Sequence, residues 1–141
     1  MKFFIQGIPK PQPRPRATNR GKFIKIYSEQ SDWKKNIKKI SALYKSEGNY
    51  FDQAIEVNLY FQFHRPNSHY RTGKFSHLLK DSAIEHHIVK PDKDNLEKAV
   101  TDALTDGGIF SDDCIIIRGL TSKTYVTREE SAGCLVEINL I

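Results

Sequence analysis

The sequence predicts one mixed α/β (α+β) domain, in which a largely antiparallel sheet is combined with two main helices. Three observations support this fold class. The 141 residues match the usual size of a single domain. Two stretches repeat apolar residues at helical spacing, and a third alternates strictly between apolar and polar residues. No repeat, low-complexity tract or linker divides the chain, so residues 1–141 are expected to fold as one unit.

The first half of the chain is expected to form three strands and one helix. MKFFIQG opens it as a strand, and FIKIY at residues 23–27 is a short second strand. Prolines at every second position from Pro9 to Pro15 favour a stiff, extended arm between them. Strict alternation over residues 54–65 predicts a half-buried strand. The helix between residue 28 and about residue 47 is marked by an apolar stripe of Trp33, Ile37, Ile40, Leu43 and Tyr44.

The second half is expected to hold a long loop, a helix and two strands. Residues 66–91 show no sustained period, and loops of that length are usually functional or mobile. Their histidines are expected to have surface or packing roles. Apolar spacing predicts a second helix from about residue 95 to residue 106, ended by a glycine pair. Residues 114–126 and 134–141 are expected to close the fold as an antiparallel pair.

Positive charge is concentrated near the start of the chain. The whole chain carries a formal net charge of +5, whereas residues 1–45 contain 12 Lys/Arg and only two acids. This asymmetry favours a polyanionic partner, most simply nucleic acid, although a basic face that only aids solubility has the same composition. The candidate DNA-contacting residues are Arg14, Arg16, Arg20, Lys34, Lys38 and Lys93.

Membrane insertion and disulfide bonding are not expected. No segment approaches the roughly 18 unbroken apolar residues of a membrane span, and the first apolar run is too short for a signal peptide. The cytoplasm is therefore the expected location. Cys114 and Cys134 are isolated in strand-like sequence, which predicts small buried hydrophobic residues rather than a disulfide or a zinc site.

The stretch from residue 92 to residue 113 is strongly acidic. It holds seven carboxylates and two lysines in an otherwise basic chain. A purely structural interpretation makes Asp94 the N-cap of the helix, with Glu97 completing a capping box and Lys98 paired with Asp94 or Asp102.

A metal site is the alternative interpretation of the same residues. In extended chain after Pro91, Asp92 and Asp94 point the same way, and a strand entering at residue 114 can bring Asp113 near them. Three converging carboxylates repel one another unless a cation joins them, and oxygen-only ligands suit Mg²⁺ or Mn²⁺. Composition and spacing leave both interpretations open.

The run KPDKDNLEKAVTDAL, followed by DDCII, closely resembles the signature of the RusA family of Holliday junction resolvases, which are crossover junction endodeoxyribonucleases. An RPR opening at residues 14–16, an HRP strand end at 64–66 and the strand containing Lys123 agree with the same family. The resemblance spans nearly the whole chain and implies a RusA-like fold. The matching residues of the central motif are Asp92, Asp94, Asn95, Leu96, Lys98, Asp102, Ala103, Leu104, Asp112 and Asp113.

The resemblance also implies residue roles. Asp92, Asp94 and Asp113 match the family's metal-binding catalytic aspartates, and Lys98 matches its catalytic lysine. Asp112 matches a possible additional acid. Lys93 is a departure, because the family often has an apolar residue between the two aspartates.

The implied activity is Mg²⁺-dependent hydrolysis of phosphodiesters in four-way junction DNA, with Mn²⁺ as a substitute ion. Paired, symmetric nicks in recombination and repair suit a homodimer with two active sites. Two alternatives remain: a non-catalytic module that binds branched DNA, and a metal-dependent nuclease for other DNA structures. A restriction-type PD…(D/E)-x-K motif fails because Leu96 stands two residues before Lys98, and the strands that an HNH nuclease needs around its histidine are missing.

Overall fold

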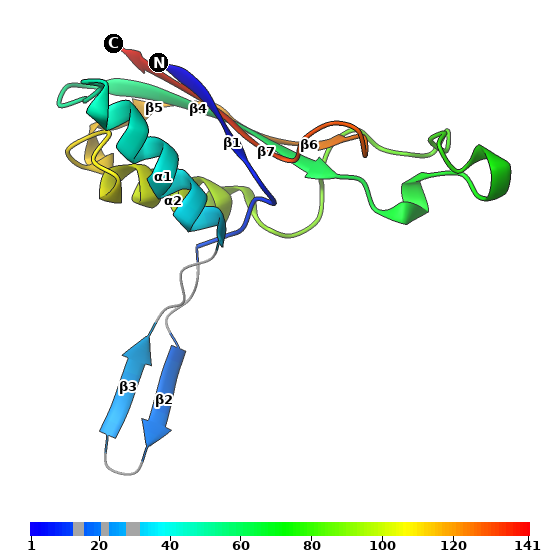
Figure 1. Ribbon diagram of the computed structural model, residues 1–141, viewed down its shortest axis with the longest axis horizontal. Helices are drawn as coiled ribbons and strands as arrows, with labels where there is room; N and C mark the ends of the chain where they lie inside the picture. The colour runs from blue at the N-terminus through cyan, green and yellow to red at the C-terminus, as the bar shows by residue number, and fades with distance from the viewer. Residues whose placement is uncertain (13–15, 21–22, 28–31) are drawn as a thin grey trace.

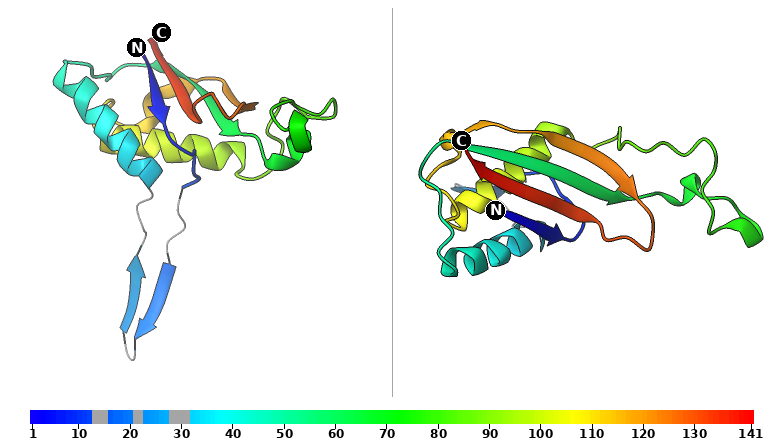
Figure 2. Two further views of the ribbon diagram at one scale, coloured as in Figure 1. Left: turned by 45° about the vertical axis from the view of Figure 1, so that its right-hand side comes forward. Right: turned by 90° about the horizontal axis from the view of Figure 1, so that it is seen from above.

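The structure, a computed structural model, describes residues 1–12, 16–20, 23–27 and 32–141, with the backbone alone for 16–20 and 23–27. Five strands of the described chain form one mixed sheet, and two helices cover one of its faces (Figures 1 and 2). The predicted fold class is therefore confirmed. The strands of this sheet are β1 (Lys2–Gln6), β4 (Ile55–His64), β5 (Ile116–Arg118), β6 (Thr121–Val126) and β7 (Gly133–Leu140).

The long strand β4 lies at the centre of the sheet. Strand β7 pairs with it antiparallel on one side, and β1 pairs antiparallel with β7. Strands β5 and β6 pair with its other side in parallel. The expected antiparallel pairing of residues 114–126 with 134–141 is therefore wrong, because β4 separates them. A parallel return needs a long crossover, and the loop and helix after β4 provide it.

The strand predicted over residues 114–126 is interrupted. It begins as the 3₁₀ helix η3 (Asp113–Ile115), continues as β5 and restarts as β6 beyond Gly119. A Cβ atom on Gly119 would lie 1.8 Å from the Val57 carbonyl oxygen, so the chain passes too close to β4 for any side chain here. This close approach separates the two short strands.

A separate two-stranded sheet occupies the segment before the first helix. Strand β2 (Arg16–Arg20) pairs antiparallel with β3 (Phe23–Tyr27), and Figure 1 shows this hairpin away from the main sheet. The strand predicted over residues 23–27 is confirmed, whereas its partner was not expected. Arg14, predicted to lie on the proline-rich arm, falls outside the described residues.

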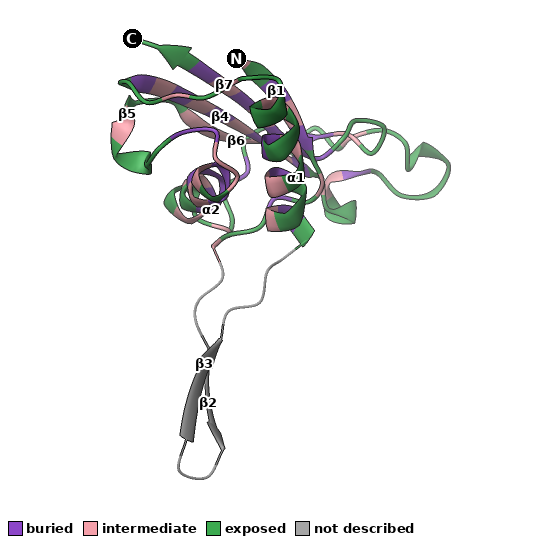
Figure 3. Cartoon of the chain, turned by 60° about the vertical axis from the view of Figure 1, so that its left-hand side comes forward, coloured by how far each residue is buried: buried purple, intermediate pink, exposed green. Residues whose placement is uncertain are grey.

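Both predicted helices are present. Helix α1 (Asp32–Ser46) buries Trp33 and Ile37 against the sheet, but Leu43 is 56% exposed and lies off the packed stripe. Figure 3 shows that α1 carries both buried and exposed segments. The predicted start at residue 28 falls outside the described residues. Helix α2 (Lys93–Asp106) begins two residues earlier than predicted. No helix in the described ranges is both long enough and apolar enough to span a membrane.

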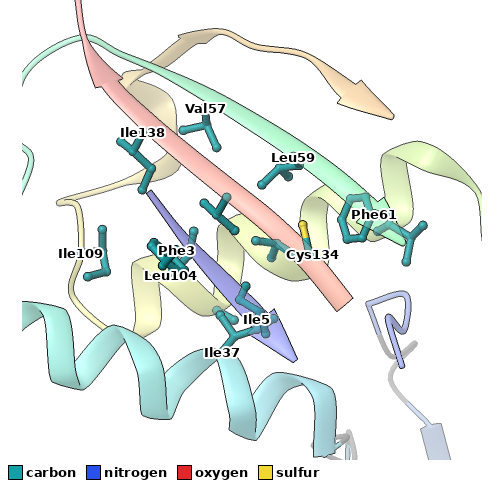
Figure 4. Close-up of a cluster of buried hydrophobic side chains, with 14 of the residues drawn as sticks. Phe3, Ile5, Ile37, Val57, Leu59, Phe61, Leu104, Ile109, Cys134 and Ile138 are labelled. Carbon is teal, nitrogen blue, oxygen red and sulfur yellow. The ribbon is translucent and has the colours of Figure 1, made fainter. Parts of the chain in front are cut away.

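The hydrophobic core lies between the sheet and the two helices. Its side chains come from β1, β4 and β7 on one side and from α1 and α2 on the other (Figure 4). Cys134 is buried in this core, as predicted. Cys114 is exposed because it lies in η3 rather than in a strand, so the prediction of a buried residue was wrong there. The labelled members of the cluster are Phe3, Ile5, Ile37, Val57, Leu59, Phe61, Leu104, Ile109, Cys134 and Ile138.

Candidate active site

Strand β6 fixes the start of α2 from two sides. The Lys123 ammonium donates hydrogen bonds to the Val89 and Pro91 carbonyl oxygens, at 2.7 and 2.6 Å. The Thr121 hydroxyl donates to a Glu97 carboxylate oxygen at 2.8 Å. The chain on either side of Asp92 and Asp94 is therefore attached to the same strand.

This arrangement changes the predicted cap. Asp92, not Asp94, occupies the N-cap position, in extended conformation and without a side-chain capping hydrogen bond. Asp94 lies in the first helical turn. The prediction that Asp92 and Asp94 both lie in extended chain and point the same way is therefore wrong. Glu97 bonds Thr121 and does not return to the cap. The capping-box prediction was wrong because contacts with β6, distant in sequence, replace local capping.

Both aspartates are exposed at the positive end of a helix. The unpaired N–H groups of the first turn and the helix dipole favour negative charge there. Asp92 and Asp94 therefore place acidic side chains where the helix end attracts them. Their carboxylate oxygens are accessible, which is the property a cation or its bound water requires.

One face of α2 carries a line of charged side chains. Asp94, Lys98 and Asp102 are spaced four residues apart and share that face. The Lys98 ammonium lies 3.3 Å from a carboxylate oxygen of Asp102. Of the two predicted partners of Lys98, Asp94 and Asp102, the structure shows pairing with Asp102. The Lys98 side chain is still 61% exposed and can reach a ligand outside the protein.

A shallow pocket lies beside the last turns of α2. Asp106 pairs there with two lysines of α1, at 3.4 Å from each ammonium. Lys34 and Lys38, the predicted DNA contacts on α1, thus direct their charges toward an acidic surface. The lining residues are Lys34, Asp102, Thr105, Asp106, Asp112 and Asp113.

The two adjacent acids at this pocket have different surroundings. Asp112 caps η3, since its carboxylate accepts the Cys114 backbone N–H at 2.8 Å. This hydrogen bond lowers the pKa of the Asp112 carboxyl from its ordinary value. Asp113 is exposed in the first turn of η3. One carboxylate oxygen of Asp112 is therefore used in capping η3.

The predicted metal ligands fall into two neighbouring groups. Asp92 and Asp94 stand at the start of α2, whereas Asp113 shares the pocket with Asp102. Because a helix rises about 1.5 Å per residue, Asp102 lies about 12 Å along the axis from Asp94. In the part of the chain that the structure describes, no three His, Cys, Asp or Glu side chains are grouped closely enough to hold an ion. The donor types suit Mg²⁺ or Mn²⁺, and the three-aspartate site stays a prediction.

Several site residues were missed or set aside on sequence grounds. The spacing of Asp94, Lys98 and Asp102 placed Asp102 on the Lys98 face, whereas no sequence pattern assigned Asp106 to the two lysines of α1. Lys123 was part of the family resemblance without a role. Its contacts with Val89 and Pro91 join segments more than 30 residues apart, which no local pattern indicates.

The remaining predicted DNA contacts lie close to the start of α2 or on the hairpin. Lys93 is 60% exposed and lies 4.0 Å from a Glu97 carboxylate oxygen. Arg16 and Arg20 stand at the two ends of β2. The Gln12 backbone N–H donates to the Asn95 carbonyl oxygen at 3.2 Å, so the chain leading to the hairpin touches the first turn of α2.

Comparison with known proteins gives one positive result. A family model described as "Endodeoxyribonuclease RusA" matches residues 6–139. A search of curated proteins found no match.

Proposed function

The chain belongs to the RusA family of endodeoxyribonucleases, and we propose that it is a Mg²⁺-dependent, structure-specific nuclease that resolves Holliday junctions by paired, symmetric nicks. The proposal assigns it to DNA recombination and repair in the cytoplasm. The observation that carries it is the exposed face of α2, where Asp94, Lys98 and Asp102 lead from the cap at Asp92 to the Asp112–Asp113 pocket.

Electrostatics explain why this face would need a cation to act on DNA. Carboxylates repel a phosphodiester, so the acidic face alone would reject its substrate. A bound Mg²⁺ supplies positive charge at the phosphate and lowers the pKa of a coordinated water. Asp92, Asp94 and Asp113 are the proposed ligands. Joining all three requires η3 to come closer to the first turn of α2 than it does in this structure.

Lys98 is the proposed contact to the reacting phosphate. Its ammonium is mostly exposed and is held at 3.3 Å from Asp102, which restrains the long side chain without burying its charge. From this position on the Asp94 face, the ammonium can donate to a phosphate oxygen and stabilise charge that develops there. Asp102 then acts as a positioning residue for Lys98.

Paired nicks follow from the symmetry of the substrate. A four-way junction presents two equivalent strands, and a two-fold homodimer presents two equivalent sites. We therefore propose a homodimer as the active form.

The test compares cleavage of a four-way junction, a linear duplex and a flap, each with Mg²⁺, Mn²⁺ or EDTA. We expect ion-dependent cutting of the junction alone. Equal cutting of the linear duplex would exclude the resolvase assignment but retain a nuclease. Tight junction binding without cutting of any substrate would favour the non-catalytic module.

Single substitutions test the residue roles in the same assay. Asp92→Asn, Asp94→Asn and Asp113→Asn should each lower the cleavage rate at least about a hundred-fold, because each loses a charged ligand. Asp106→Asn is the matched control, since Asp106 lines the same pocket but pairs with Lys34 and Lys38. A wild-type rate for Asp92→Asn would remove the metal-site proposal.

A further inference from the structure

The segment that follows β4 forms a projecting finger, defined here as residues 66–84. Figures 1 and 2 show it extending beyond the end of the sheet, well away from the chain termini. It contains the 3₁₀ helices η1 (Asn67–His69) and η2 (Gly73–Phe75). The structure thus gives shape to a region that the sequence marked only as a long loop.

Hydrogen bonds within the finger hold its two sides together. The Arg71 backbone N–H donates to the Leu78 carbonyl oxygen at 2.8 Å, and the Lys80 N–H donates to that of His69 at 2.9 Å. Between these bonds, Tyr70 and Leu79 form an antiparallel bridge. The finger therefore has a regular backbone structure of its own.

The base of the finger is fixed to the rest of the fold. Arg128, from the turn before β7, places its guanidinium 3.8 Å from the centre of the Tyr70 ring and donates to the Asn67 side chain at 3.0 Å. Arg65, at the end of β4, donates to the Ile84 carbonyl oxygen at 2.6 Å. These contacts attach the finger to the sheet near both of its ends.

The surface of the finger and its base is cationic. Residues 64–84 contain four Lys/Arg and one acid, Asp81. Arg71 meets Asp81 at 3.4 Å, whereas neither Lys74 nor Lys80 has a carboxylate within 4.0 Å among the described residues. All residues from 71 to 78 are exposed. The charge of this surface is therefore largely uncompensated.

Aromatic rings take the place of carboxylates beside two of these cations. The Lys74 ammonium lies 5.2 Å from the Phe75 ring centre, and the Arg65 guanidinium lies 5.5 Å from that of Tyr125. A ring face restrains a cation without cancelling its charge. Such cations keep their full attraction for an external anion and lose less side-chain entropy on binding it.

We propose that the finger is a second DNA-contacting element, in which Lys74 and Lys80 bind backbone phosphates of a junction arm outside the cleavage site. This inference rests on the proposed function. A regularly spaced polyanion suits several exposed, unpaired cations on one rigid element. The finger leads back through residues 85–91, along β6, to Asp92, so a DNA arm held there adjoins the strand that fixes the start of α2.

The test measures junction binding in Ca²⁺ over a range of salt concentrations. For Lys74→Gln/Lys80→Gln we expect about ten-fold weaker binding near 0.1 M salt. The slope of log K against log salt should become shallower by about two, since each phosphate contact contributes about 0.9. The matched control is Lys2→Gln/Arg118→Gln, which removes the same charge at the other end of the sheet from cations that have carboxylate partners.

Two further measurements separate the possible failures. The double variant should cut junctions more slowly than the wild type at limiting protein with Mg²⁺ and regain most of the rate at saturating protein, because neither lysine lies at the acidic face of α2. Wild-type affinity and slope in the Lys74→Gln/Lys80→Gln protein would overturn the finger assignment while leaving the nuclease proposal standing. A wild-type protein that neither binds nor cuts junctions would instead refute the proposed function.

Discussion

At the scale of single residues, His87 shows how the fold controls a titratable group near the site. Its ring stacks on Phe63 with centroids 3.9 Å apart and also contacts Tyr125, and the residue is only 8% exposed. Burial lowers the pKa of His87, and the positive charge of Lys123 lowers it further. The fold therefore holds the neutral imidazole.

We expect this group to make stability depend on pH. Above the ordinary histidine pKa of about 6.5, the ring is neutral in both folded and unfolded chains and contributes no pH dependence. Between that value and the lower pKa of the folded state, the unfolded chain binds more protons, so the free energy of unfolding decreases as pH falls. Chemical denaturation at a series of pH values measures this decrease.

The variant His87→Phe isolates the effect, because phenylalanine keeps the stacked ring and cannot be protonated. Its free energy of unfolding should depend less on pH over the same window. His77→Gln is the control, since His77 is exposed on the finger and should leave the wild-type slope intact. An unchanged slope in His87→Phe would show that another group governs the acid response.

At the scale of secondary-structure elements, β6 acts as the support for the start of α2. The His87 N–H donates to the Lys123 carbonyl oxygen, and the Tyr125 N–H donates to that of Glu85, so residues 85–87 pair with the strand. The Lys123 side chain then continues the attachment to Val89 and Pro91. Asp92 therefore directly follows Pro91, whose carbonyl oxygen accepts the Lys123 hydrogen bond.

This predicts that Lys123 is a positioning residue for Asp92. Lys123→Met should weaken Mn²⁺ binding, measured by calorimetry, by about ten-fold or more, as is typical when a supporting contact of a ligand is lost. The Mg²⁺ concentration for half-maximal cleavage should rise by the same factor, with a smaller loss at saturating Mg²⁺. Lys123→Arg, which can still donate to both carbonyl oxygens, should restore most of the binding.

Arg128→Met provides the matched control. Arg128 also joins the 66–91 segment to the sheet, through Asn67 and Tyr70, but at its far end from Asp92. It should leave Mn²⁺ binding unchanged. If Lys123→Met binds Mn²⁺ like the wild type, Lys123 has only a general structural role.

The same elements show what the sequence could and could not predict. Alternation in β4 and the apolar spacing of both helices are local patterns, and the structure confirms each of them. The partner of a strand is not a local property, so the position of β5 and β6 beside β4 was missed. Likewise, the prediction of Asp94 as the N-cap was wrong, because contacts of Lys123 and Thr121, which lie far along the chain, set the start of α2.

At the scale of the whole molecule, acidic and basic residues are concentrated in different parts of the sequence. The acidic face of α2 is mostly local in sequence, whereas cations gather in residues 1–45 and again on the finger. A nuclease needs carboxylates at the scissile phosphate and cations elsewhere along the same backbone. The chain carries both kinds of charge, and the lysines paired at the acidic pocket contact Asp106 and Asp102 rather than the proposed ligands Asp92, Asp94 and Asp113.

The proposed two-fold homodimer makes a prediction about how many strands are cut. Light scattering should give a mass of twice 16.2 kDa for the protein in solution. A mixed dimer, purified through two different tags and containing one Asp92→Asn subunit, keeps a single intact site. On a supercoiled plasmid that extrudes a cruciform, the wild type should yield linear product, because both strands are cut in one encounter.

The mixed dimer should instead yield nicked circles, since its second site cannot hydrolyse the opposing strand. A mixed dimer of two active subunits that carry the same tags is the control and should yield linear plasmid. Subunit exchange is excluded by measuring the tags again after the reaction. If the half-inactive dimer yields linear plasmid at the control rate, one site makes both cuts, and paired action by two symmetric sites is wrong.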